Sequence, residues 1–169
     1  MKILIISPYF FPENFRINDF AFRMSKRGHK VAVLTGMPNY PEGKFFGEFK
    51  ILKKQKFNDV EIYRVPILPR GNSNKINLLM NYLSFLISGI IFGPFLLRNF
   101  KPSLIFAINY SPPSASIIGY LLSKIYRVPL YLWIQDLWPE SLIATKTVNM
   151  KFILNFIRRV LTFIYNSSS

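Results

Sequence analysis

The fold is decided near the start of the chain by residues 2–36, which read KILIISPYFFPENFRINDFAFRMSKRGHKVAVLTG. Ile3 to Ile6 is an unbroken apolar run, which is typical of a strand buried on both faces of a parallel sheet. Apolar residues then recur at helical spacing, at Ile17, Phe20, Ala21 and Met24. Gly28 ends the predicted helix, and Val31 to Leu34 forms the next apolar run. This order of strand, helix and strand predicts a βαβ unit with a right-handed crossover.

The rest of the chain continues the alternation of strands and helices. We predict further strands at 60–65, 104–109 and 130–134, a helix at 114–126 and a last amphipathic helix at about 150–165. Residues 60–65 alternate apolar with polar side chains, which predicts an edge strand. We therefore expect the α/β class, with a Rossmann-like, doubly wound and mostly parallel sheet. It should form one domain over residues 1–165, followed by a short polar tail at 166–169.

Composition and charge restrict the classes of function. The 169 residues include no cysteine, which excludes disulfides, thiolate metal sites and cysteine nucleophiles. The 22 basic and 8 acidic residues give a net charge of +14, which attracts anionic lipid, phosphorylated substrates or nucleic acid. The basic residues are spread along the chain, without a recognition helix, metal-finger spacing or RNA-binding sheet motif. High charge together with high apolarity therefore favours a membrane surface over nucleic acid as the partner.

Residues 76–97 form the most apolar segment, with no charged residue between Lys75 and Arg98. Its length meets the criterion for a membrane span. Its polar side chains and the Gly93-Pro94 break argue against a span, and so do the strands on both sides of it, which must pair in one compartment. We expect an amphipathic or partly buried helix that touches the bilayer, with insertion as the alternative. The first strand is too short for a signal peptide, so we expect a cytoplasmic chain, peripheral to the inner face of the cell membrane.

Polar residues that could carry function follow the predicted strands. They lie in the loops Ser7–Asn14, Asn109–Pro113 and Gln135–Ser141. In open α/β sheets, ligands bind at the carboxyl ends of the strands, where helix N-termini also favour anions. The first loop lacks the glycine fingerprint of dinucleotide sites. Because the chain has no Asp-x-Asp pair and a single histidine, His29, which is expected at the surface, we expect no metal site built by the protein.

Two acidic residues in these loops have more than one interpretation. Asp136 either faces a ligand or caps the helix that follows, with Trp138 packing beside it as a core aromatic. Glu13 would repel a phosphate bound at the first loop, so it could instead bind a sugar hydroxyl. The spacing of the residues alone leaves these alternatives open.

Several segments together resemble family-4 glycosyltransferases. The resemblance rests on the opening residues 2–14, on Arg27–Val31 and on Leu34–Pro41. Two further segments, Tyr110–Pro113 and Gln135–Ser141, narrow it to the WbuB-like group, which is associated with O-antigen and capsule assembly. The likeness is collinear over about residues 1–145.

The resemblance implies the GT-B architecture, in which two Rossmann-like domains face each other across a cleft. The amino-terminal domain receives an acceptor, often a lipid-linked saccharide, and the other domain holds the nucleotide-sugar donor. Transfer retains the anomeric configuration and requires neither a divalent metal nor another cofactor. By the same resemblance Asp136 is the candidate catalytic residue beside the transferred sugar. The candidate acceptor-binding residues are Glu13, Asn14, Arg16, Asn39, Tyr40, Tyr110, Ser111, Gln135 and Glu140.

The sequence departs from the family pattern at its carboxy-terminal end. It closes at Ser169 without the donor domain of a complete transferase. Because groups on both sides of the transferred sugar are needed to stabilise the transition state, we expect no transferase activity from this chain alone. A separate donor-domain polypeptide is then the expected partner. The alternative is a non-catalytic module that binds a membrane surface or a partner protein.

Overall fold

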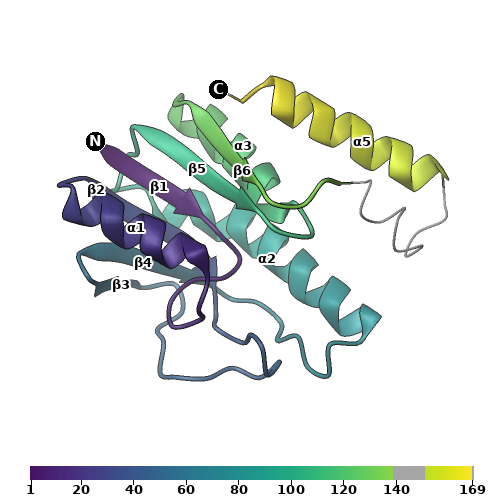
Figure 1. Cartoon of the computed structure of the whole chain (residues 1–169), viewed down its shortest axis with the longest axis horizontal. Helices are drawn as coiled ribbons and strands as arrows, with labels where there is room; N and C mark the ends of the chain where they lie inside the picture. Colours follow the sequence, from purple (N-terminus) through teal and green to yellow (C-terminus); the bar gives the residue numbers. More distant parts are fainter. Residues whose placement is uncertain (139–150, 169) are drawn as a thin grey trace.

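The computed structural model describes residues 1–138 and 151–168. Within these residues a six-stranded sheet has the order β3-β4-β2-β1-β5-β6 (Figure 1). The strands are β1 (Lys2–Ile6), β2 (Lys30–Gly36), β3 (Lys54–Phe57), β4 (Val60–Val65), β5 (Leu104–Asn109) and β6 (Leu130–Ile134). The helices are α1 (Arg16–Lys26), α2 (Lys75–Leu96), α3 (Ser114–Tyr126) and α5 (Lys151–Asn166). The α/β, Rossmann-like fold predicted from the sequence is confirmed.

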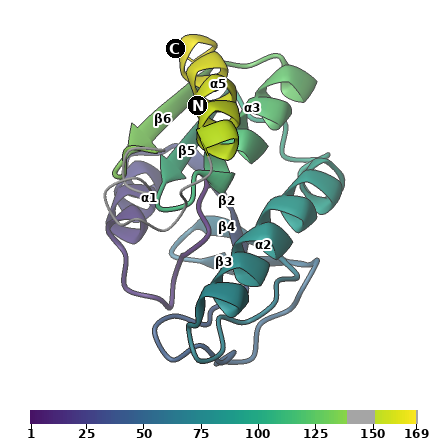
Figure 2. The ribbon, with the colours of Figure 1, turned by 90° about the vertical axis from the view of Figure 1, so that its right-hand side faces the viewer.

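The core consists of two apolar layers, one on each face of the sheet. Alternate residues of β1 point to opposite faces, as the two-residue period of a strand requires. Ile3 and Ile5 pack with α1, whereas Leu4 and Ile6 pack with α2 and α3. Figure 2 shows α1 on one side of the sheet and α2 and α3 on the other. Burial on both faces explains the unbroken apolar runs of the central strands.

The prediction that residues 60–65 form an edge strand is wrong. β4 pairs with β2 in parallel on one side and with β3 in antiparallel on the other, so β3 lies at the edge. The hairpin turn is Asn58-Asp59, where both residues have positive φ, as a type I′ turn requires. The sequence KQKF of β3 is polar and mostly exposed, so it carries no apolar signal from which a strand could be predicted.

Helix α2 is partly buried, along one narrow face. The buried positions are Asn81, Phe85, Gly89 and Gly93, and their spacing of four residues places them on one side of the helix. Gly89 faces Ile118 of α3, and an added Cβ there would lie 2.5 Å from the Ile118 Cδ1 atom. This helix passes the length and hydropathy test for a membrane span, with 22% of its most apolar window buried. Contact with a bilayer remains a prediction.

Helix α5 covers the end of the sheet nearest β6 and α3 (Figure 1). Among the side chains of α5 that the structure describes, Leu154, Leu161 and Ile164 are buried, whereas Phe156 and Phe163 are exposed. Tyr120 of α3 packs edge-on against the Phe163 ring, with 5.4 Å between the ring centroids. The predicted last helix is therefore present and amphipathic, and it reaches Asn166, the first residue of the predicted tail.

Candidate functional site

The carboxyl ends of β1, β2, β4, β5 and β6 lie along one edge of the parallel sheet, because parallel strands share a direction. The loops that leave this edge hold nearly all of the site residues predicted from the sequence. Contacts between the loops are made by side chains that are distant in sequence.

Glu13 ties the loop after β1 to the loop after β2. Its Oε1 accepts hydrogen bonds from the backbone N–H groups of Asn39 at 3.0 Å and Tyr40 at 2.8 Å, and its Oε2 accepts one from Phe10 at 3.3 Å. The side chain is only 3% exposed. Burial raises the pKa of the Glu13 carboxyl, and the three backbone hydrogen bonds oppose that rise. Glu13 therefore holds the loops in place, and its oxygens are engaged by the protein itself.

Arg64 supports the same loops from inside the sheet. The side chain is fully buried, although residues 60–65 alternate apolar and polar types. Its Nη1 donates to the Gly36 carbonyl at 3.0 Å and its Nη2 donates to the Phe11 carbonyl. The Phe49 ring lies 4.4 Å from the guanidinium carbon. Burial lowers the pKa of Arg64 to about 10, and the nearby Glu13 opposes that shift.

Asn39 connects the second loop to the segment after β4. Its Oδ1 accepts a hydrogen bond from the Arg70 backbone N–H at 3.1 Å, and its Nδ2 donates to the Met37 carbonyl at 2.9 Å. Like Glu13, the Asn39 side chain is buried. Two of the predicted acceptor-binding residues thus act as links between loops in this structure.

Aromatic side chains surround the surface that these loops form. The ring of Tyr9 stacks on Phe15 at 4.7 Å and lies 5.7 Å from Tyr40 and 5.8 Å from Tyr110, measured between ring centroids. Burial raises the pKa of Tyr110 to about 12. The Tyr110 hydroxyl is buried and has no hydrogen-bond partner among the described residues. The cluster therefore offers π faces together with one unused hydroxyl.

Arg70 lies at this aromatic cluster and was not predicted as a site residue. Its Nη1 donates to the Tyr9 hydroxyl at 3.0 Å, and its guanidinium carbon lies 5.0 Å from the Tyr40 ring centroid. The ion pairs found in the described part of the chain, Lys54–Glu61 and Lys56–Asp59, do not involve it. The signal that could have revealed Arg70 is its position in the loop that follows a parallel strand.

The loops after β5 and β6 complete the edge. The buried side chain of Asn109 accepts from Ser116 Oγ at 2.8 Å and donates to the Tyr165 hydroxyl of α5 at 3.3 Å. The Ser111 Oγ accepts a hydrogen bond from Trp138 Nε1 at 2.8 Å. The two loops are therefore bound to each other and to α5.

The remaining predicted residues are divided between exposed and half-buried positions. Asn14, Arg16 and Gln135 have exposed side chains, whereas Asp136 is half-buried after β6. Glu140 and the helix that Asp136 was predicted to cap lie outside the described residues. Trp138 is half-buried and lines an apolar cavity, so it is not enclosed in the core.

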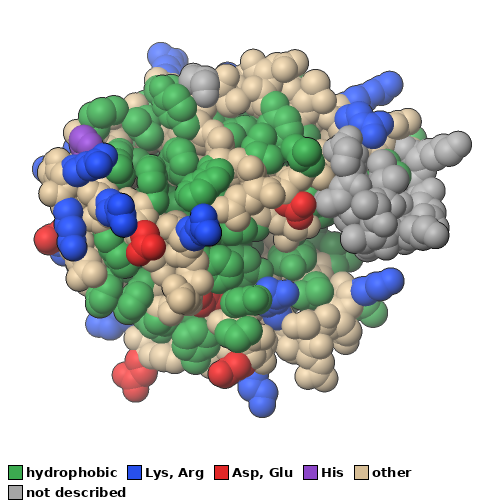
Figure 3. All heavy atoms as spheres, viewed as in Figure 1, with side chains coloured by type: hydrophobic (Ala, Val, Ile, Leu, Met, Phe, Trp, Pro, Cys, Tyr) green, Lys and Arg blue, Asp and Glu red, His purple; other side chains and the backbone are tan. Residues whose placement is uncertain are grey.

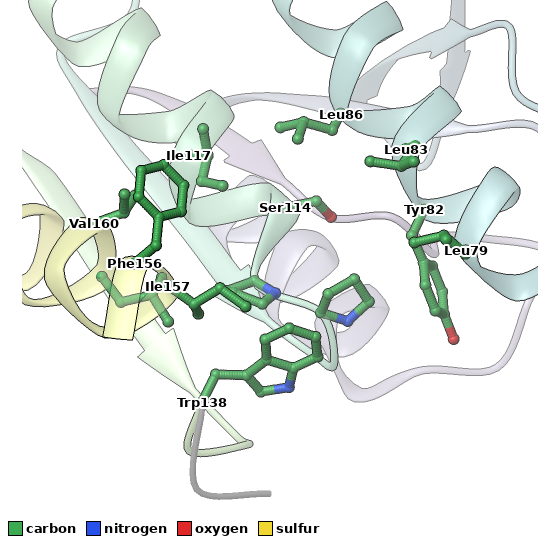
Figure 4. Close-up of a pocket in the computed structure, with 13 residues that line it drawn as sticks. Leu79, Tyr82, Leu83, Leu86, Ser114, Ile117, Trp138, Phe156, Ile157 and Val160 are labelled. Atoms are coloured by element: carbon green, nitrogen blue, oxygen red, sulfur yellow. The ribbon is translucent and has the colours of Figure 1, made fainter. Parts of the chain in front are cut away.

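An apolar cavity of about 260 Å³ opens beside the aromatic cluster. Figure 4 shows side chains of α2, α3 and α5 and Trp138 lining it from different sides. The lining residues are Leu79, Tyr82, Leu83, Leu86, Pro112, Pro113, Ser114, Ile117, Trp138, Phe156, Ile157, Val160 and Leu161. Tyr82 of this lining lies near the aromatic cluster, because burial and then the Tyr82 side chain raise the pKa of the Tyr9 hydroxyl.

Among the described residues, no group of three or more His, Asp or Glu side chains lies together to hold a metal ion. His29 lies at the opposite edge, beside the Met1 amino group. Lysine and arginine side chains are spread over the face seen in Figure 3 and form no continuous stripe there.

No family model matches this chain, and no curated protein matches it.

Proposed function

We propose that this chain is the acceptor-binding domain of a retaining glycosyltransferase of GT-B architecture, which extends a lipid-linked saccharide during surface polysaccharide synthesis. The observation that carries the proposal is the arrangement at the carboxyl edge of the sheet. There the polar and aromatic loops meet an apolar cavity of about 260 Å³. A lipid-linked saccharide combines the same two chemical parts, a sugar and an alkyl chain.

The aromatic cluster suits the sugar. The half-exposed ring of Tyr40 and the ring of Tyr110 present flat apolar surfaces, and hydroxyl groups beside them donate and accept hydrogen bonds. Asp136 would lie beside the transferred sugar. The nucleotide-sugar would be bound by a second Rossmann-like domain facing this edge, without a divalent metal. Such a reaction belongs at the inner face of the cell membrane, where both substrates are present.

The test is binding that depends on the sugar of the acceptor. A polyprenyl-diphosphate-linked monosaccharide in detergent micelles is compared with the same lipid diphosphate without the sugar, and with a panel of nucleotide-sugars. We expect the sugar-bearing lipid to bind most tightly and the nucleotide-sugars to bind weakly or not at all. Equal binding of the two lipids, or tighter binding of a nucleotide-sugar, would contradict the proposal. Transfer of a radiolabelled sugar by this chain alone would contradict the assignment of acceptor binding only.

A matched pair of variants tests the location of the sugar. Tyr40 and Tyr131 are similarly exposed, at 40% and 42%, but only Tyr40 lies in the aromatic cluster. Tyr40→Ala should weaken the sugar-dependent part of binding about fivefold, since a stacked aromatic contributes about 1 kcal/mol. Tyr131→Ala should leave it unchanged. Equal effects of the two substitutions would place the sugar elsewhere.

A second candidate function, a non-catalytic module at a membrane surface, is favoured by the outer face of α2. Exposed apolar side chains on that helix include Ile76, Met80, Ile87, Ile91 and Phe95. A contiguous apolar surface of this kind is typical of membrane or partner contacts. Sedimentation with vesicles containing phosphatidylglycerol tests this candidate. Vesicle binding without any preference for a sugar-bearing lipid would favour the module over the glycosyltransferase.

A further inference from the structure

The cavity between α2, α3 and α5 has the walls of a site for a hydrocarbon chain. Leucine, isoleucine, valine, proline and aromatic side chains form most of its lining. The polar groups of the lining side chains are the hydroxyls of Ser114 and Tyr82 and the indole N–H of Trp138, which donates to Ser111. Figure 4 shows Leu83 and Leu86 of α2 opposite Ile117 and Phe156. Water in such a space would lack hydrogen-bond partners, so an apolar occupant is favoured.

The size of the cavity limits what can occupy it. A cavity of about 150 Å³ lined by Leu, Ile and Phe binds benzene, which has six carbon atoms. By proportion, the 260 Å³ found here would hold about ten carbon atoms. This is enough for part of one alkyl or prenyl chain. It is too small for two chains side by side over the same length.

Arg70, which contacts Tyr9, forms no ion pair with the described residues. Tyr82 lines the cavity. Burial and the neighbouring Tyr82 side chain raise the pKa of the Tyr9 hydroxyl, which accepts a hydrogen bond from Arg70 Nη1 at 3.0 Å. Arg70 takes part in neither of the ion pairs found in the described part of the chain. Its Nε is buried and has no hydrogen-bond partner within that same part. A guanidinium with unused donors favours an anionic ligand, and its planar set of donors matches a phosphate.

We propose that the cavity binds the chain of a single-chain lipid phosphate, with Arg70 binding the phosphate. An apolar cavity and a nearby guanidinium with no ion pair among the described residues together complement the two parts of such a molecule. The inference deepens the proposed function, and it rests on that function for the identity of the lipid as the acceptor. The aromatic cluster around Tyr9 would then receive the sugar beyond the phosphate.

The test separates the chain from the charge. Binding of n-decyl phosphate below its micelle concentration is measured by isothermal titration calorimetry, beside n-decanol and inorganic phosphate. We expect decyl phosphate to bind at one site about ten- to a hundredfold more tightly than decanol, because a hydrogen bond to a charged group adds about that factor. Inorganic phosphate should bind more weakly than either. Decanol binding as tightly as decyl phosphate would overturn the role of Arg70.

Variants locate the two parts. Arg70→Gln should lower the affinity for decyl phosphate to that of decanol and leave decanol unaffected. Leu83→Trp should fill the cavity and weaken both ligands about tenfold or more. Its control is Ile87→Trp, one turn further along the exposed side of α2; Leu83 and Ile87 are 41% and 55% exposed, and only Leu83 lines the cavity. Equal effects of the two tryptophans, or none from Leu83→Trp, would overturn the assignment of the cavity.

The outcomes for this inference and for the proposed function are distinct. Decyl phosphate carries no sugar, so its binding tests the cavity and Arg70 alone. If the sugar-bearing lipid binds in preference to the bare lipid diphosphate but decyl phosphate does not bind, the inference fails and the proposed function stands. If decyl phosphate binds as expected but the sugar adds no affinity, the inference about the site stands and the proposed function fails.

Discussion

Replacement of Glu13 by Gln tests whether this residue holds the loops of the site together. Gln has nearly the same shape as Glu, but it replaces one carboxylate oxygen by an NH₂ group. The Glu13 Oε1 accepts from the N–H groups of Asn39 and Tyr40, and its Oε2 accepts from Phe10. With an amide oxygen toward Asn39 and Tyr40, the NH₂ group would face the Phe10 N–H, and two donors would oppose each other.

The expected loss of stability follows from these contacts. A buried donor without a partner costs about 1–3 kcal/mol, and hydrogen bonds to a charged acceptor are worth about 1 kcal/mol more each than neutral ones. Removal of a buried charge offsets part of this loss, since burial raises the pKa of the Glu13 carboxyl. We therefore expect Glu13→Gln to lower the free energy of unfolding at pH 7 by about 2–3 kcal/mol.

Chemical denaturation measures the change directly. Urea unfolding of the wild type and the variant, followed by tryptophan fluorescence and by circular dichroism, should show a lower midpoint with an unchanged slope. Glu42→Gln is the control, because Glu42 is exposed and lies two residues after Tyr40 in the loop that follows β2. Its effect should stay within about 0.5 kcal/mol. A Glu13→Gln protein as stable as the control would refute the role of Glu13 as a link between loops.

Three further outcomes are expected. The folded-state pKa of Glu13 is raised above its ordinary value of 4.5, so its contribution to the free energy of unfolding should decrease as the pH rises from below 4.5 through the folded pKa. In urea titrations, the stability of the wild type relative to Glu13→Gln should therefore fall over that range of pH. Phe85→Ala should lower the free energy of unfolding by about 3–5 kcal/mol, whereas Ile87→Ala on the exposed face of α2 should change it by less than about 1 kcal/mol. Gly28→Ala should cost about 1–2 kcal/mol in thermal unfolding, because φ is +84° there although no atom lies within 4 Å of the added Cβ; an unchanged melting temperature would argue against strain at this turn.

Local patterns were sufficient to predict most of the sheet and its helices. The helix at 114–126 and the strands at 104–109 and 130–134 have the predicted bounds, because each is a continuous apolar or periodic segment that packs against the core. β3 was missed because an exposed, polar edge strand is held by its hydrogen bonds to β4 and not by burial. The edge position assigned to β4 was wrong for the same reason.

The sequence predicted that the candidate site residues follow the parallel strands, and the structure has the described ones at the carboxyl edge of the sheet, but the sequence did not predict which of their side chains bond to other loops. Glu13 and Asn39 were predicted to bind an acceptor, and the structure shows their side chains buried and bonded to other loops. Arg64 and Arg70 lie close together in sequence, yet one is fully buried in the sheet and the other lies at the aromatic cluster without an ion-pair partner in the described part of the chain.

The alternation of parallel strands with helices, the two buried faces of β1 and the apolar character of α2 were therefore determined by the sequence itself. These features depend on neighbours within a few residues along the chain. The tertiary structure alone decided which polar groups are already engaged by the protein and which stay available to a ligand. The partners of Glu13 are up to 27 residues away, and Arg70 meets the Tyr9 hydroxyl across 61 residues. Hydrogen bonds and burial depend on such distant neighbours, which no local pattern specifies.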